Sequence, residues 1–180
     1  SAKDTQSDWR DIPAHDRFTE LIEGADNVTA LHAGESLSIC GLTFDVYAAY
    51  DEELSSLYED GVANISSLVF EVSARNTSML FCGDLRTDEM CSYLIDAYGD
   101  VLQADYFQIG HHGNSSVSHA FIDAVSPSIA FFDCPEWLYN SEQHDAHENW
   151  EYCSATGAQC FRWSSRYGSP STAASTAMAG

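Results

Sequence analysis

Two apolar runs that each end in polar, metal-binding side chains constrain the fold of this chain most strongly. Residues 79–82 lead into Gly83 and Asp84, and residues 106–109 lead into the motif Gly110-His111-His112-Gly113. In a sheet covered by helices, buried strands deliver such residues to one edge, where ligand sites collect. Asp and His together are the ligand types expected for zinc, manganese or iron. The sequence therefore predicts a metal site at the ends of two strands.

The composition allows one domain with a hydrophobic core and disfavours passive nucleic-acid binding. The chain has 180 residues, of which 44% are hydrophobic. Seven Lys and Arg face 28 Asp and Glu, and the formal net charge of −21 repels phosphate backbones. A phosphorylated substrate would need a metal ion or a local arginine to overcome this field. General solubility, a high-salt environment and a cationic partner are each consistent with such a charge.

The sequence leaves the compartment open. It shows no signal-peptide pattern and no apolar stretch near the roughly 18–20 residues of a membrane span, so cytoplasmic and extracytoplasmic locations both remain. Six cysteines show no CxxC spacing, and a Cys-only zinc site is not expected. Cys153 and Cys160 could form a disulfide, although a reduced state fits at least as well.

The hydrophobic pattern predicts a mixed α/β domain over residues 1–163, followed by a flexible Ser/Ala/Gly-rich tail over 164–180. The first part should be mostly antiparallel and the rest should alternate helix and strand, with the helices on one face of a single sheet. The expected helices are 15–25, 88–98, one capped by Ser118 that ends before Pro127, and one capped by Asp145 that ends near Gly157. The expected strands are 28–33, 36–40, 42–48, 67–74, 78–82, 106–109, 128–132 and 158–163.

The candidate site residues each have a structural alternative. Asp84 alone could be a turn or cap residue. In an extended segment His111 and His112 would point to opposite sides, so that one could bind metal while the other contacts a carboxylate or substrate. His144 and His147 have a spacing that could place both on one helix face, or they are solvated. The histidines not expected to be functional are His15, His32 and His119.

Four segments in this order carry a resemblance to a known family: residues 64–71, 80–84, 104–115 and 121–130. They resemble the metallo-β-lactamase superfamily, and most closely the hydrolase domain of ComEC-type competence proteins and their soluble relatives. The resemblance covers about residues 15–163, and the Gly-His-His-Gly block is its most specific part. It implies a four-layer αββα sandwich, of which this chain supplies mainly the C-terminal ββα half.

The resemblance also implies a metal centre, usually with two zinc ions, with manganese as the alternative. Asp84 matches the aspartate that bridges both metals, and His112 is favoured over His111 as the last histidine ligand. His111 would then contact substrate or support the metal shell. His144 matches the histidine of a His-Pro loop and would contact a phosphate or leaving group. The implied reaction is hydrolysis of an ester, amide or phosphodiester by metal-activated water.

The sequence departs from the superfamily at its most diagnostic motif. H-x-H-x-D-H, which supplies most ligands from the first half of the fold, does not occur here. Asn64 stands where many members have another histidine, and Asp145 replaces the proline after His144. One aspartate and one or two histidines fall short of the three protein ligands that a catalytic zinc usually has.

Three interpretations remain open. The chain is part of a metal-dependent hydrolase that needs the missing N-terminal half, or a degenerate interaction module that completes its sandwich with a partner or a homodimer, or an acidic α/β domain of another function. The first interpretation predicts a small phosphodiester or related ester as substrate, with nucleic acid bound only through the metal. The second predicts a stable fold without metal.

Overall fold

The structure is a computed structural model that describes residues 12–50, 64, 66–86, 88–115 and 117–162. Within them, seven strands form one sheet in the order of the chain. The tail 164–180 and the start of the predicted domain lie outside the described residues. The strands are β1 (Ser36–Ile39), β2 (Leu42–Ala48), β3 (Val69–Ala74), β4 (Thr77–Phe81), β5 (Tyr106–Gln108), β6 (Ile129–Phe132) and β7 (Gln159–Arg162).

The first four strands are antiparallel and are joined in two places by tight turns. Between β1 and β2, Cys40 and Gly41 both have positive φ, 53° and 83°. This backbone matches the right-handed twist of a two-residue hairpin, and Gly41 adopts it without a Cβ clash. Between β3 and β4, Ala74 pairs with Thr77 across a second two-residue turn. The predicted antiparallel part is therefore confirmed for strands β1 to β4.

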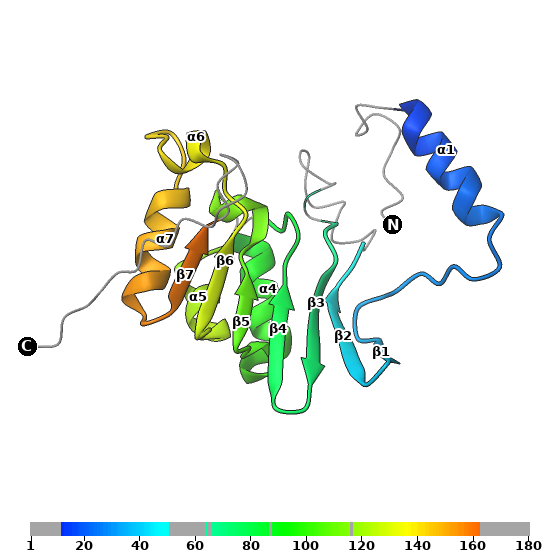
Figure 1. The fold of residues 1–180 in the computed structure, drawn as a ribbon, viewed down its shortest axis with the longest axis horizontal. Helices are drawn as coiled ribbons and strands as arrows, with labels where there is room; N and C mark the ends of the chain where they lie inside the picture. Colours follow the sequence, from blue (N-terminus) through cyan, green and yellow to red (C-terminus); the bar gives the residue numbers. More distant parts are fainter. Residues whose placement is uncertain (1–11, 51–63, 65, 87, 116, 163–180) are drawn as a thin grey trace, which may run out of the picture.

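The last four strands are parallel, and helices connect them. Figure 1 shows α4 and α5 behind the sheet, with α7 beside β7. The predicted cap of α5 is confirmed, because the Ser118 hydroxyl accepts a hydrogen bond from the Phe121 N–H at 3.2 Å. The helices are α4 (Asp88–Tyr98), α5 (His119–Val125), α6 (Glu136–Tyr139) and α7 (Ala146–Ala155), with short 3₁₀ turns at Gly99–Leu102 and Gly110–Gly113.

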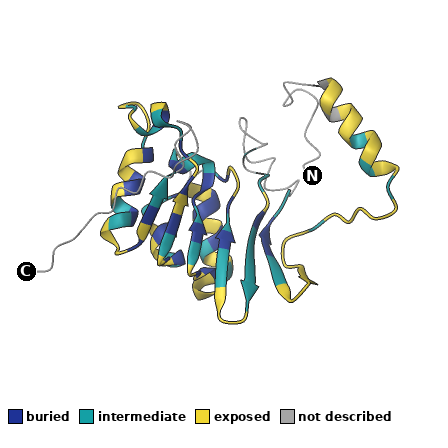
Figure 2. Ribbon diagram, viewed as in Figure 1, coloured by how far each residue is buried: buried dark blue, intermediate teal, exposed yellow. Residues whose placement is uncertain are grey.

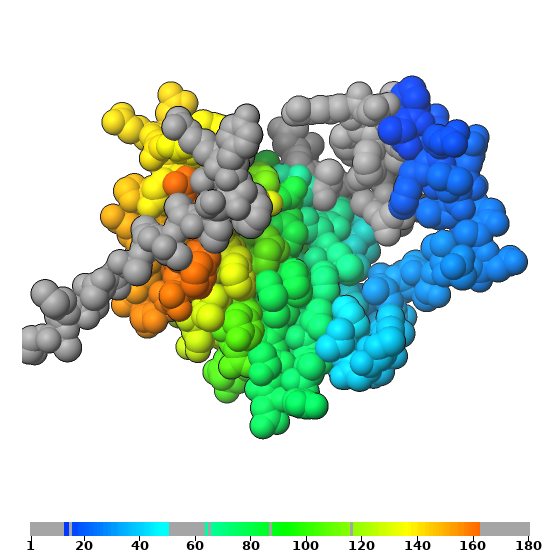
Figure 3. Space-filling model, in the orientation of Figure 1, coloured from blue at the N-terminus to red at the C-terminus, as the bar shows by residue number. Residues whose placement is uncertain are grey.

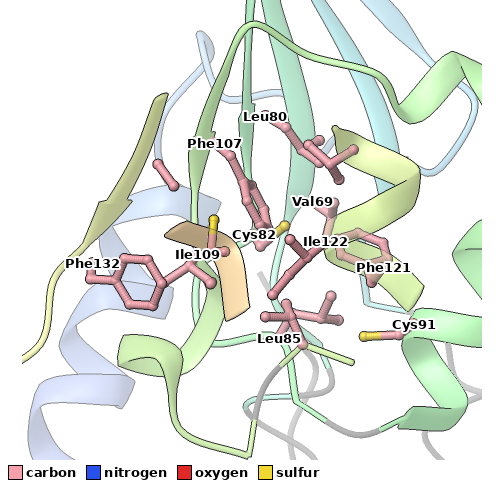
Figure 4. Packing of buried hydrophobic residues seen from close by; sticks show 14 of the residues in the cluster. Val69, Leu80, Cys82, Leu85, Cys91, Phe107, Ile109, Phe121, Ile122 and Phe132 are labelled. Carbon is pink, nitrogen blue, oxygen red and sulfur yellow. The ribbon is translucent and has the colours of Figure 1, made fainter. Parts of the chain in front are cut away.

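The hydrophobic core lies between the sheet and these helices (Figure 4). Leu80, Phe107 and Ala130 face the helices from three neighbouring strands, and each is fully buried. Phe107 meets Phe121 of α5 with ring centroids 6.1 Å apart. One apolar layer thus packs the parallel strands against the helices.

The other sheet face carries aromatic side chains at the alternate positions of the strands. Phe70 stacks on Phe81 at 5.0 Å between ring centroids, and Phe131 stacks on Phe161 at 5.9 Å. None of the described helices covers this face. Phe70, Phe81, Phe131 and Phe161 lie on this surface, which is called the uncovered face of the described sheet below.

The N-terminal region differs from the sequence prediction. The first helix, α1, spans Ile12–Glu23 rather than 15–25, and its Phe18 and Leu21 are 52% and 62% exposed (Figure 2). Residues 28–33 form no strand, and only the following residues pair with β2, through Val46. The spacing of apolar residues predicted both the first helix and a strand at 28–33. Neither segment packs into the core, and without such packing the spacing alone does not determine where an element begins or ends.

Two further differences lie near β6 and α7. The helix α6 was not predicted, since four residues give too little periodicity. Asp145 stands at the N-cap position of α7, but its carboxylate accepts a hydrogen bond from Ser115 N–H at 2.6 Å instead of capping the helix. No described helix combines the length and apolarity needed to cross a membrane.

Candidate metal centre

The parallel strands bring the predicted site residues to one edge of the sheet. Asp84 follows β4, the Gly110–Gly113 turn follows β5, and Asp133 follows β6. Since β4, β5 and β6 run in the same direction, their carboxyl ends meet there. The start of β3 reaches the same edge, because β3 is antiparallel to β4.

The backbone around Asp84 is held by three hydrogen bonds from neighbouring segments. Asp84 N–H donates to the Ser67 hydroxyl at 3.1 Å, while Cys82 and Gly83 N–H both donate to Gln108 Oε1 at 3.0 Å. Gly83 has a φ of 53°. Glycine adopts this conformation easily, and the turn carries the Asp84 carboxylate out of the sheet. Asp84 is therefore positioned by a built turn rather than by a helix cap.

The two histidines lie in a left-handed turn, which corrects the expectation of an extended segment. His111 has φ 42° and ψ 41°, and His112 has φ 63° and ψ 15°. Such values are unusual for residues other than glycine and tend to occur at functional sites. Asn149 of α7, which is buried, holds the turn by donating to the Gly113 carbonyl at 2.8 Å.

Both glycines of the motif are needed for close packing. A Cβ on Gly110 would lie 2.8 Å from the Leu85 carbonyl oxygen. A Cβ on Gly113 would lie 2.8 Å from Cδ1 of Phe132, and Gly113 has a φ of 81°. The sequence motif Gly-His-His-Gly thus encodes a turn that presses against two strand ends.

His112 and Asp84 converge in the orientation expected of two metal ligands. Nε2 of His112 lies 3.8 Å from Oδ1 of Asp84, and the two side chains are 43% and 52% exposed. Nδ1 of His112 lies 2.6 Å from the Asp133 carbonyl oxygen. A carbonyl can only accept, so Nδ1 is the donor in this contact, and in the neutral ring Nε2 then presents its lone pair toward Asp84. Metal-binding histidines are commonly oriented by such a second hydrogen bond.

His111 is fixed in a similar way. Its Nδ1 lies 2.6 Å from the Asn114 carbonyl oxygen, and its ring centroid is 6.0 Å from that of His112. By the same reasoning Nδ1 donates and Nε2 is left as an acceptor. The ring therefore lies beside the Asp84–His112 pair with a basic nitrogen available.

The structure does not bring His144 and His147 onto one helix face. His144 lies before α7, and its ring meets the edge of Trp137 at 6.2 Å between centroids. His147 is within α7, where Nε2 lies 3.5 Å from Glu151 Oε1 and the ring packs on Tyr139 at 4.7 Å. Their described contacts do not include the Asp84–His112 pair.

The described residues supply fewer metal ligands than a catalytic zinc usually has. No group of three or more His, Cys, Asp or Glu side chains that could hold a metal occurs among the described residues. Burial raises the pKa of the Cys82 thiol and raises that of Cys134 to about 11, so both thiols are protonated at neutral pH in this structure. Asp84 and His112 fit a metal in kind and orientation, but they supply two of the usual three ligands.

Several supporting contacts were not predicted from sequence. The Ser67 hydroxyl, the Asp133 carbonyl and the Asn149 amide hold Asp84, His112 and the histidine turn. A serine, a backbone carbonyl and an asparagine have no distinctive spacing, so the sequence carries no signal for them.

No protein-family model matches this chain, and no curated protein matches it. Among solved structures, it is similar to CmlA, a diiron β-hydroxylase from Streptomyces venezuelae. The identity is 13% and the TM-score 0.51, covering 76% of this chain and 33% of that one. A putative zinc-dependent hydrolase of the metallo-β-lactamase superfamily from Thermotoga maritima matches with 12% identity and a TM-score of 0.33, covering 58% of this chain and 48% of that one.

These similarities concern the fold. The chain has the mixed α/β architecture of the metallo-β-lactamase fold, built on one seven-stranded sheet. It spans about one third of the length of the diiron protein. At such identities, the reaction and metal of either protein do not transfer to this chain.

Proposed function

We propose that this chain carries part of a metal-dependent hydrolytic centre, in which Asp84 and His112 bind the metal and His111 contacts the substrate. The metal would be zinc, in the two-ion arrangement that the ComEC-like resemblance implies, with manganese or iron as alternatives. A neighbour of similar fold is described as a diiron protein, which supports a metal-dependent function. When bound, the metal would activate a water for hydrolysis.

One observation carries the proposal: contacts within the protein hold the Asp84–His112 pair with the two side chains facing each other. Nε2 of His112 faces the Asp84 carboxylate at 3.8 Å, and the Asp133 carbonyl fixes the tautomer. Backbone strain at His111 and His112 is retained only because Gly113, Asn149 and Asp133 hold the turn. A turn that served only to connect β5 to α5 would not need two left-handed histidines.

The remaining ligands would come from a segment with the H-x-H-x-D-H motif, the N-terminal half of the same fold. This segment would dock on the uncovered aromatic face of the sheet and bring its ligands to the edge where Asp84 lies. A homodimer is the second way to cover that face. The aromatic rows of Phe70 with Phe81 and Phe131 with Phe161 support the presence of a second layer.

The proposed substrate is a small phosphodiester or a related ester. The charge of −21 disfavours a long polyanion, so nucleic acid would bind only through the metal. His144 would contact the phosphate or leaving group, and its neighbour Asp145 accepts a hydrogen bond from Ser115 N–H, just after the histidine turn.

Metal binding by the purified chain tests the proposal directly. Isothermal titration with Zn²⁺, Mn²⁺ and Fe²⁺ should show one-to-one but weak binding of at least one ion, because this chain supplies two of the usual three ligands. Asp84→Ala and His112→Ala should each weaken it by about 100-fold or more, because each removes a ligand, whereas loss of an outer partner costs 10–100-fold. Asp96→Ala and His147→Ala, which change exposed residues whose described contacts do not include the pair, serve as matched controls and should bind like the parent.

The outcome separates the two functional interpretations. Metal binding lost in both variants, together with metal-dependent hydrolysis of bis(p-nitrophenyl) phosphate or p-nitrophenyl acetate once the H-x-H-x-D-H segment is added, supports the hydrolase. Equal metal binding in all five proteins would show that the metal lies elsewhere and would refute the assigned ligands.

The alternative is a non-catalytic interaction module, favoured by the uncovered apolar face and by the presence of only two well-placed ligands. It predicts a monodisperse, metal-free protein whose melting temperature does not change with Zn²⁺, Mn²⁺ or Fe²⁺. A rise in melting temperature with any of these ions, abolished by His112→Ala, would count against it.

A further inference from the structure

A surface cavity of about 410 Å³ lies at the same sheet edge as Asp84. Three segments far apart in sequence form it: the connection after α1, the end of β2 and the residues before β3. Figure 1 shows that connection returning toward β1 and β2, and Figure 3 shows the same segment alongside the sheet in space-filling form. A volume of this size lies within the range of small-molecule sites. The lining residues are Thr29, Ala30, Leu31, His32, Ala49, Tyr50, Ser66 and Leu68.

The loop wall of the cavity is tied to the sheet. Gly34 N–H donates to the Val46 carbonyl at 2.8 Å, and Val46 N–H donates to the Glu35 carbonyl at 2.9 Å. Within the turn, His32 N–H donates to Oε2 of Glu35 at 2.8 Å. The segment before it is therefore held against the end of β2, although it forms no strand of its own.

The lining is apolar and uncharged, which distinguishes it from the rest of this acidic chain. Ala30, Leu31, Ala49 and Leu68 are aliphatic, and Tyr50 adds an aromatic ring. Thr29, Ser66 and His32 supply the polar atoms, and no carboxylate or guanidinium is among the described residues that line it. A phosphate would find no counter-charge here, and a neutral apolar group with one hydrogen-bonding atom suits these walls best.

The cavity is adjacent to the segment that positions Asp84. Ser66 and Leu68 flank Ser67, whose hydroxyl accepts the hydrogen bond from Asp84 N–H at 3.1 Å. A Cβ on Gly83 would lie 3.3 Å from the Ser67 Cβ and 3.9 Å from the Leu68 carbonyl oxygen. A ligand in the cavity would thus end close to the proposed metal centre.

We propose that this cavity binds a neutral, apolar part of the substrate, such as a short acyl or alkyl chain, beside the bond to be cleaved. The proposal rests on the proposed hydrolytic function and narrows its substrate class to esters with one uncharged apolar arm. The cavity lining selects that arm, whereas Asp84 and the histidines act on the bond. His32, which sequence reasoning left without a role, becomes the rim residue that can hydrogen-bond a polar end of the arm.

A charge series of six-carbon probes tests the inference at pH 7.5: 1-hexanol, hexanoate and hexylammonium. Binding is followed by the chemical shifts of methyl groups in a ¹³C-labelled full chain. We expect 1-hexanol to shift the methyls of Ala30, Leu31, Ala49 and Leu68, and to bind at least tenfold more tightly than either charged probe. Preference for hexylammonium would show that the general acidic field, not the lining, governs binding, and would overturn the proposal.

A second test fills the cavity by substitution. Ala49→Phe and Ala30→Phe each place a ring among the lining residues and should weaken 1-hexanol binding at least tenfold. Ala30 is in an exposed loop, so Ala30→Phe should retain the fold. It keeps the test usable even if Ala49→Phe unfolds the protein. Ala120→Phe adds the same ring at an exposed position of α5 and should bind 1-hexanol like the parent. Unchanged binding in both cavity variants, or shifts at Val72 and Ile129 on the uncovered face instead, would refute the site.

The same titration in the metal-free Asp84→Ala variant separates this inference from the proposed function. We expect 1-hexanol binding to be unchanged, because Asp84 does not line the cavity. Probe binding without metal binding would leave the cavity as a ligand site and reject the hydrolase. Metal binding without probe binding would keep the metal centre and reject the apolar substrate arm.

Discussion

Both faces of the sheet carry large apolar residues, but their surroundings differ. On the helix side, Leu80 and Phe107 are fully buried in one core cluster. On the other side, Phe131 is 37% exposed, although it stacks on the rings of Tyr106 and Phe161. A sheet with water on one face normally alternates apolar and polar residues. Apolar residues on both faces indicate that the second face is built to be covered.

The largest expected effect is a difference in stability between two Phe→Ala variants, one on each face of the sheet. Phe107→Ala should lower the free energy of unfolding by about 3–5 kcal/mol, because it leaves a cavity in the core. Phe131→Ala should cost about 1 kcal/mol, since water can fill the space and only ring stacking is lost. Urea denaturation of both variants provides the measurement. Equal losses would mean that the second face is as tightly packed as the first, and the comparison would fail.

A smaller loss of stability is expected from a substitution where the histidine turn packs against Phe132. Gly113→Ala combines a positive φ with a clash against Phe132, and should destabilise the protein by about 2–4 kcal/mol. Gly34→Ala is the control, because Gly34 has a φ of 84° and nothing within 4 Å of its added Cβ. It should cost about 1 kcal/mol from backbone strain alone. Thermal melts followed by circular dichroism would measure the difference, and similar costs would argue against a tightly packed turn.

The smallest effect concerns a polar residue on the covered face. Glu71 accepts a hydrogen bond from the Tyr47 hydroxyl at 3.2 Å, and burial raises the pKa of the Glu71 carboxyl above its ordinary 4.5. The folded state then binds more protons than the unfolded state from about pH 4.5 upward to the raised pKa, so Glu71 lowers stability as pH rises through that window.

The variant Glu71→Gln should therefore lose this pH dependence. We expect its advantage over the parent to grow with rising pH and to stay below about 1 kcal/mol, because solvent screens a half-exposed group. Urea midpoints between pH 4 and pH 8 provide the test. A parent protein whose stability rises relative to Glu71→Gln over this range would contradict the assigned direction of the pKa shift.

Much of the architecture was predictable because local patterns agreed with tertiary packing. The β2 strand has the predicted bounds, and Ser118 caps α5 as expected. The failures lie where packing is weak or motifs are short: residues 28–33, the ends of α1, and α6. Alternation predicts a strand only if a neighbour accepts its hydrogen bonds, and residues 29–32 of this segment line a cavity instead of pairing.

The candidate site likewise has features that the sequence predicted and features that it did not. Sequence reasoning placed Asp84 and the two histidines at strand ends, and the structure brings them to one edge. It could not predict the left-handed turn, because φ at a histidine depends on what holds it, here Asn149 and Asp133 from other elements. Nor could it find the cavity, whose walls come from three separate segments.

By itself, the sequence determined the strand-helix alternation, the acidic charge, and the Gly-Asp and Gly-His-His-Gly motifs with their chemistry. These follow from residue type and spacing, which act over a few residues. Only the tertiary structure decided which His112 nitrogen faces Asp84, that His144 lies against Trp137, and that none of the described helices covers one sheet face. Those features depend on contacts between residues far apart in the chain, and no local pattern specifies them.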